Sequence, residues 1–148
     1  MIETAVQTLV VNAVIDAGGM AMKMAHKFLM GVPDLLIKLP ADRRAMIMEA
    51  KLERRAQMTR RTQHPLTPAV TVNQFNYLTK FHLAGTPAGV MSFVEVGGRG
   101  KRGLWLHISM LPQYRPGMSF NEMEYVLVGD DFDNGVIGAL ETAERLTR

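Results

Sequence analysis

Two strand-like segments on either side of a turn constrain this fold more than any other feature of the sequence. Residues 35–37 are an apolar run, residues 46–53 alternate in polarity, and residues 40–43 have the composition of a turn. The sequence therefore predicts a β-hairpin. If the chain reverses at residues 41 and 42, the positions that face each other add up to about 83, so Asp34 lies opposite Glu49 and Ala50.

This register would bring three charged side chains together. Lys51 shares a strand face with Glu49, because side chains two positions apart point to the same side, while Ala50 points to the other. Two carboxylates as close as Asp34 and Glu49 repel each other unless a cation lies between them, and Mg²⁺ prefers carboxylate, carbonyl and water oxygens. We therefore expect Asp34 and Glu49 to bind Mg²⁺, which Mn²⁺ would replace, with the Ala50 carbonyl as a third ligand.

Such a site is suited to the hydrolysis of phosphodiesters. A metal ion stabilises charge on the phosphoryl oxygens and lowers the pKa of bound water. Lys51 would orient or deprotonate that water, or would neutralise the scissile phosphate, and the sequence leaves these roles open. The net charge is only +3 over 148 residues, but basic side chains gather at residues 51–61 and 99–102. The DNA-binding candidates are Arg54, Arg55, Arg60, Arg61, Arg99, Lys101 and Arg102.

The rest of the sequence predicts further helices and strands around the hairpin. Apolar spacing and capping residues predict helices over residues 2–17, from the capping box at 71–74 to Gly85, and around 136–143. Strands are predicted over residues 20–27, 90–96, 104–110 and 125–128, with a basic tip at 97–103 and a mobile loop over 54–70. This order predicts one α/β or α+β domain with a mixed sheet of about five strands flanked by helices.

The charged residues also resemble a known motif. Pro33-Asp34, followed after fourteen residues by Glu49-Ala50-Lys51, is similar to the signature of the PD-(D/E)xK nuclease superfamily, above all VRR-NUC domains and the Holliday-junction resolvases of phages, archaea and bacteria. The resemblance implies a restriction-endonuclease-like core over residues 1–96, with 97–148 as an extension. It also implies that Glu3, on the first helix, completes the metal site, and that Gln74 belongs to the catalytic set.

The residues and the resemblance together indicate a Mg²⁺-dependent DNA endonuclease that acts on branched DNA such as Holliday junctions. Junction resolution needs two symmetric cuts, so the resemblance also implies a homodimer. The lack of cysteine and of an apolar run of ~20 residues predicts a cytoplasmic protein without membrane contact, and the family suggests a phage origin. The alternatives are a nickase, a flap or general nuclease of phage replication or DNA degradation, and a non-catalytic DNA-binding protein with the same fold.

Each candidate residue also has a purely structural interpretation. Asp34 follows a proline and would serve as a turn residue, while Glu49 and Lys51 would form an exposed ion pair. Gln74 fits the third position of a capping box, and Glu3 would complement the dipole of its helix. The basic segments would then be solvated charge runs. The four histidines and the absence of cysteine offer no zinc-ligand spacing.

Overall fold

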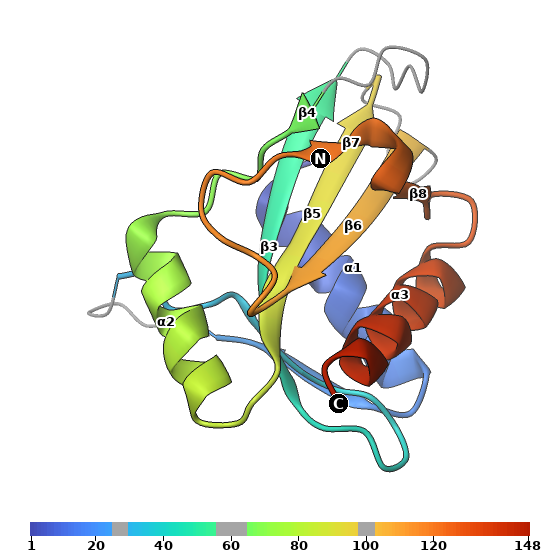
Figure 1. Ribbon diagram of the computed structural model, residues 1–148. Helices are drawn as coiled ribbons and strands as arrows, with labels where there is room; N and C mark the ends of the chain where they lie inside the picture. Colours follow the sequence, from blue (N-terminus) through green and yellow to red (C-terminus); the bar gives the residue numbers. More distant parts are fainter. Residues whose placement is uncertain (25–29, 56–64, 98–102) are drawn as a thin grey trace.

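A six-stranded mixed sheet forms the centre of the molecule in the computed structural model, which describes residues 1–24, 30–55, 65–97 and 103–148. The strand order is β1-β2-β3-β5-β6-β8 (Figure 1). Only β3 and β5 are parallel, and the other neighbours are antiparallel. The strands are β1 (Met20–Lys23), β2 (Leu35–Lys38), β3 (Met46–Arg55), β5 (Ala88–Val96), β6 (Leu104–Met110) and β8 (Val126–Leu127).

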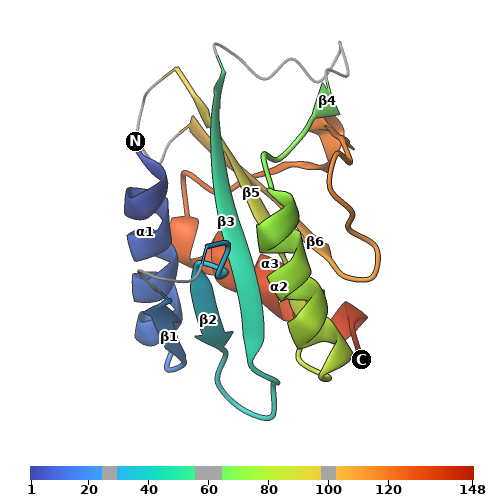
Figure 2. The same cartoon turned by 90° about the vertical axis from the view of Figure 1, so that its left-hand side faces the viewer.

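Helices cover both faces of this sheet. α1 (Glu3–Asp16) and α3 (Phe132–Leu146) pack on one face and contact each other, while α2 (Val72–Leu83) lies on the opposite face (Figures 1 and 2). A 3-10 helix (Glu122–Glu124) follows β7 (Phe120–Asn121), which pairs with β4 (Pro65–Leu66) in a separate two-stranded sheet. In the described part of the chain, no helix has the length and apolar content needed to span a membrane.

Alternating side chains of β3 supply two separate cores. Met48 and Ala50 face α1 and α3, where they join one buried apolar cluster. Ile47 faces α2 and joins a second cluster that includes Leu78 of that helix. Because successive strand residues point to opposite faces, Glu49 lies on the face opposite Met48 and Ala50, as predicted, and this is the α2 side of the sheet.

The predicted helices and the predicted hairpin are confirmed. The capping box also forms: Thr71 Oγ1 accepts a hydrogen bond from the Gln74 N–H, and Gln74 Oε1 accepts one from the Thr71 N–H. The sheet has six strands instead of about five, and the β4–β7 pair was not predicted. Two-residue strands that pair across more than fifty positions leave no periodicity in the sequence.

Some predicted segments lie partly outside the described residues. These are the strand over 20–27, the loop over 54–70 and the tip over 97–103, from which residues 25–29, 56–64 and 98–102 are excluded. Residues 104–146 supply β6 and α3 to the same sheet and the same core as the first part of the chain.

Candidate metal centre

The register of the β2–β3 hairpin places the first two candidate residues side by side. Leu35 pairs with Met48, which is the predicted register, so Asp34, just before β2, lies opposite Glu49. The backbone N–H of Ala50 donates a hydrogen bond of 2.9 Å to Oδ2 of Asp34. The Asp34 carboxylate is therefore fixed against the middle of β3.

Glu49 is fully buried, and neither of its carboxylate oxygens has a hydrogen-bond donor among the described residues. Burial is the largest factor that raises the pKa of Glu49, to about 9, and the adjoining Asp34 carboxyl raises it further, because it accepts a hydrogen bond from the protonated form and repels the charged form. Glu3 also raises the pKa, and Lys51 lowers it. Glu49 therefore keeps its proton at neutral pH unless a cation replaces it.

The donor set suits a hard divalent cation. In a strand, the N–H and C=O of one residue point to the same side, so the Ala50 carbonyl faces the same side as its N–H, toward Asp34. Two carboxylates and a carbonyl match the oxygen ligands of Mg²⁺ or Mn²⁺, and a cation would satisfy the buried Glu49 oxygens. The described residues hold no cluster of three or more acidic, histidine or cysteine side chains arranged to hold a metal ion, and a ligand role for Glu3 stays a prediction.

Lys51 and Glu3 meet at a neighbouring cavity. Lys51 projects from the same face of β3 as Glu49, and a cavity of about 180 Å³ opens beside it. Glu3 from α1, Ser92 from β5 and residues 66–69 also bound this cavity. With the residues that the structure describes, the Lys51 ammonium forms no hydrogen bond or ion pair. A cation without a partner, beside a buried pair of carboxyl groups, is suited to binding an anion.

Gln74 serves the helix cap, which was one of its two predicted roles. The start of α2 nevertheless lies near the metal centre, because it packs against Gly31, three residues before Asp34. A Cβ added to Gly31 would lie 2.7 Å from the backbone carbon of Asn73 and 2.9 Å from the Gln74 nitrogen. A catalytic role for Gln74 remains a prediction.

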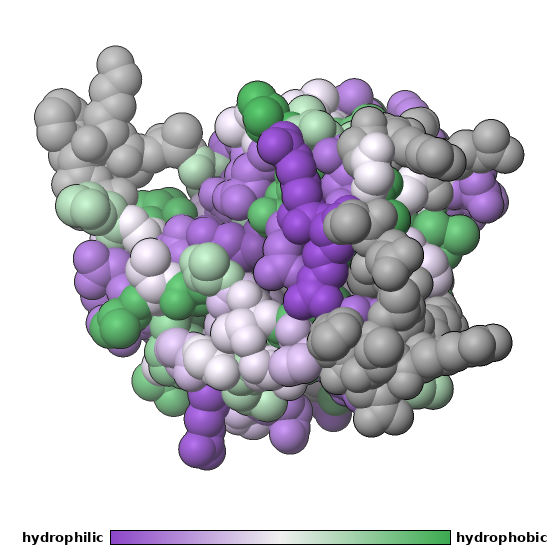
Figure 3. Space-filling model, turned by 90° about the horizontal axis from the view of Figure 1, so that it is seen from above, coloured by the Kyte–Doolittle hydropathy of each residue, from purple (hydrophilic) through white to green (hydrophobic). Residues whose placement is uncertain are grey.

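Arg55 is held within the protein, which argues against its predicted DNA-binding role. Its guanidinium pairs with the buried Glu122 at 3.0 Å and with Glu53 at 2.8 Å. Arg54 pairs with Glu95 at 3.4 Å but is 60% exposed. Hydrophilic side chains gather at the end of the molecule shown in Figure 3. The other five DNA-binding candidates, Arg60, Arg61, Arg99, Lys101 and Arg102, lie outside the described residues.

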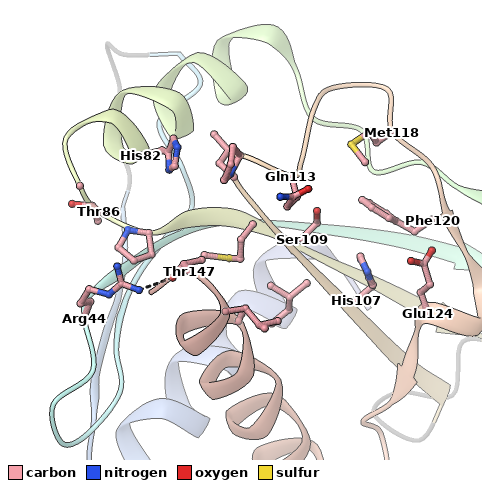
Figure 4. Close-up of a pocket in the computed structure, with 18 residues that line it drawn as sticks. Arg44, His82, Thr86, His107, Ser109, Gln113, Met118, Phe120, Glu124 and Thr147 are labelled. Atoms are coloured by element: carbon pink, nitrogen blue, oxygen red, sulfur yellow. Dashed lines mark hydrogen bonds between the residues drawn. The ribbon is translucent and has the colours of Figure 1, made fainter.

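A larger cavity, of about 580 Å³, contains none of the predicted site residues (Figure 4). It lies along the part of β6 that contributes His107 and Ser109, with His82 on one side and Thr147 on the other. Burial lowers the pKa of His107. No pattern in the sequence predicts this cavity, because its walls come from segments that are far apart along the chain.

Comparison with known proteins identifies the fold. No protein-family model and no curated protein matches this chain. Seven chains of solved structures do match. One is Hjc, a Holliday junction resolvase from the archaeal hyperthermophile Archaeoglobus fulgidus, with 14% sequence identity and a TM-score of 0.52 over 86% of this chain and 97% of that chain. The likeness confirms the predicted restriction-endonuclease-like fold.

Proposed function

We propose that this protein is a metal-dependent endodeoxyribonuclease that acts on branched DNA. The observation that carries the proposal is the contact of Asp34 with the buried Glu49, beside the Lys51 ammonium, which has no partner among the described residues. A buried acidic pair has a large cost for the folded chain in the absence of a cation. Buried carboxyl groups with a strongly shifted pKa are typical of functional sites, so this pair indicates a functional role more than a structural one.

The choice of branched DNA rests on the fold. A solved structure with the same fold belongs to a Holliday junction resolvase, and the four residues Asp34, Glu49, Ala50 and Lys51 occupy the order and spacing of the PD-(D/E)xK motif. Because junction resolution needs two symmetric cuts, the proposal includes a homodimer. A cytoplasmic location, a phage origin and the closer similarity to VRR-NUC domains remain predictions.

Each residue has a defined task in this proposal. Asp34, Glu49 and the Ala50 carbonyl hold Mg²⁺, which Mn²⁺ would replace. When bound, the ion supplies Lewis acidity that stabilises charge on the phosphoryl oxygens and lowers the pKa of water. We assign Lys51 to neutralising the scissile phosphate, since its ammonium borders the cavity without a partner among the described residues.

Cleavage of labelled DNA tests the proposal directly. A four-way junction and a linear duplex of matched sequence are incubated with Mg²⁺ or with EDTA. The wild type is compared with Glu49→Gln, and Glu141→Gln serves as the control because Glu141 is a partly exposed carboxylate on α3, paired only with Arg43 among the described residues and remote from the site. We expect paired cuts in the junction that require Mg²⁺, are abolished by Glu49→Gln and persist in Glu141→Gln.

Other outcomes identify the alternative functions. Equal cleavage of the junction and the duplex would indicate a general nuclease, and single cuts would indicate a nickase or flap nuclease. If the wild type binds the junction equally well with Mg²⁺ and EDTA but cuts nothing, the proposal is wrong and the protein is a non-catalytic DNA-binding protein.

A further inference from the structure

A row of polar side chains crosses the sheet from the candidate metal centre. Lys51 of β3 pairs in register with Ser92 of β5, and Ser92 pairs with His107 of β6. Directly paired residues on neighbouring strands point to the same face of the sheet. Ser92 therefore lies next to Lys51, on the face that also carries Glu49.

Ser92 is held in a fixed position on the wall of the Lys51 cavity. It is 5% exposed, and its hydroxyl forms a hydrogen bond of 2.7 Å with the phenol of the buried Tyr125. The Tyr125 ring lies 5.4 Å from the ring of His107, which in turn lies 4.3 Å from the ring of Phe120. This packing restrains the phenol, and the phenol restrains the serine.

Either hydroxyl can donate in the Ser92–Tyr125 hydrogen bond, and when Tyr125 donates, the Ser92 proton is available. Burial raises the pKa of Tyr125 to about 12, so the phenol keeps its proton and can donate it to Ser92 Oγ. The serine O–H can then donate to an acceptor in the cavity. The neighbouring Lys51 ammonium can only donate hydrogen bonds, so it needs an acceptor as well. A phosphate oxygen accepts from both groups, as phosphate oxygens commonly do from lysine and serine side chains.

We propose that Ser92 is a phosphate ligand of this site: held by Tyr125, its hydroxyl donates a hydrogen bond to the DNA phosphate that Lys51 neutralises. This inference rests on the proposed function and extends it. It assigns the cavity beside Lys51 to one phosphodiester of the DNA backbone and makes Ser92 a residue that contacts the substrate. Tyr125 is a positioning residue that acts through Ser92.

The test compares two buried serines on the same sheet face. Ser109 of β6 pairs with Val90, is 8% exposed and lines the other cavity, so Ser109→Ala controls for the loss of a buried hydroxyl. We expect Ser92→Ala to lower kcat/KM on the four-way junction by about tenfold or more, the effect of losing one hydrogen bond to a charged group. Tyr125→Phe, which leaves Ser92 in place, should lower kcat/KM less, and Ser109→Ala should change it less than about twofold.

Two outcomes separate the failure of this inference from the failure of the proposed function. If the wild type cuts the junction, Glu49→Gln does not, and Ser92→Ala matches Ser109→Ala, the function stands and the inference is wrong. If the wild type cuts nothing, the proposed function is wrong. The phosphate contact of Ser92 is then tested by the affinity of each variant for the junction, measured with Ca²⁺ in place of Mg²⁺. Weaker binding of Ser92→Ala alone would then support the phosphate contact, and equal binding of the two variants would overturn it.

Discussion

The backbone N–H of Ala50 is bonded to the carboxylate of Asp34 at 2.9 Å, and this contact joins the segment before β2 to the middle of β3. Strand pairing between β2 and β3 ends at Leu35 and Met48, so the Ala50 N–H has no backbone partner on this side. Asp34 supplies the missing acceptor and at the same time faces Glu49. One side chain thus has a structural task and a proposed ligand task, and mutation can separate them.

Replacing Asp34 with asparagine should abolish cleavage without unfolding the protein. Asparagine keeps an acceptor for the Ala50 N–H but loses the negative charge, so we expect activity to fall by on the order of 100-fold or more, as for loss of an electrostatic catalytic group. Asp34→Ala also loses the acceptor and should cost about 1 kcal/mol of unfolding free energy beyond the asparagine variant. Cleavage assays and thermal denaturation measure both effects. If Asp34→Asn cleaves DNA at the rate of the wild type, Asp34 is not a ligand of the metal centre.

Glu49→Gln should stabilise the metal-free protein, and the gain should grow as the pH rises above about 4.5. Burial and the Asp34 carboxyl raise the folded-state pKa of Glu49 from 4.5 to about 9. Between these values the folded chain holds a proton that the unfolded chain has released, so the unfolding free energy of the wild type falls as pH rises. Near pH 8 in EDTA, we expect the unfolding free energy of the variant to exceed that of the wild type by about 2 kcal/mol, which corresponds to a Tm that is ~4–8 °C higher. The two proteins should have equal Tm near pH 4.5, and a difference that is independent of pH would contradict this explanation.

Mg²⁺ should raise the Tm of the wild type near pH 8 and leave that of Glu49→Gln unchanged. A ligand that binds only the folded state stabilises it, by ~2.7 kcal/mol at a hundredfold excess over Kd. Glutamine lacks the charge that holds the cation. Thermal denaturation across a Mg²⁺ titration, with Glu141→Gln as the control, measures the effect. An equal rise in Tm for both variants would place the cation elsewhere.

The placement of Asp34, Glu49 and Lys51 was predictable because the information that determines it is local. The short turn fixes the register of the β2–β3 hairpin, and the period of two along β3 fixes the faces, so the positions of Asp34, Glu49 and Lys51 follow from their sequence numbers. The capping box at Thr71 and Gln74 is local in the same way.

Ser92 and Glu122 could not be found by the same reasoning. The register between β3 and β5 depends on α2 and the connections around it, and no short pattern in the sequence sets it. Arg55 was predicted to bind DNA from its place in a charge run. A charge run does not show which of its members meets a buried carboxylate, here Glu122, contributed by a segment 67 positions away.

Arg54 and Arg55 should therefore behave differently when each is replaced with methionine. Arg55→Met would leave Glu122 buried without its ion pair, and we expect a loss of about 3 kcal/mol of unfolding free energy. Arg54 is largely exposed, so Arg54→Met should change stability by less than about 1 kcal/mol. If Arg54 contacts a DNA phosphate, its loss should lower the slope of log Kd against log salt by about 1. Denaturation and salt-dependent binding measure these effects, and equal stability of the two variants would refute the assignment.

Gly31→Ala tests whether the packing of α2 holds the metal centre in place. Gly31 and Gly85 both have a positive φ, of 85° and 91°, so alanine costs each of them about 1 kcal/mol in backbone strain. A Cβ on Gly85 would meet no atom within 4 Å, whereas on Gly31 it would lie 2.7 Å from the backbone of Asn73. The clash must move either the start of α2 or the segment that leads to Asp34. We therefore expect both variants to lose stability, Gly31→Ala more, but only Gly31→Ala to lose cleavage activity when assayed well below its Tm. Full activity of a folded Gly31→Ala would show that the Ala50 contact alone is enough to hold Asp34 in place.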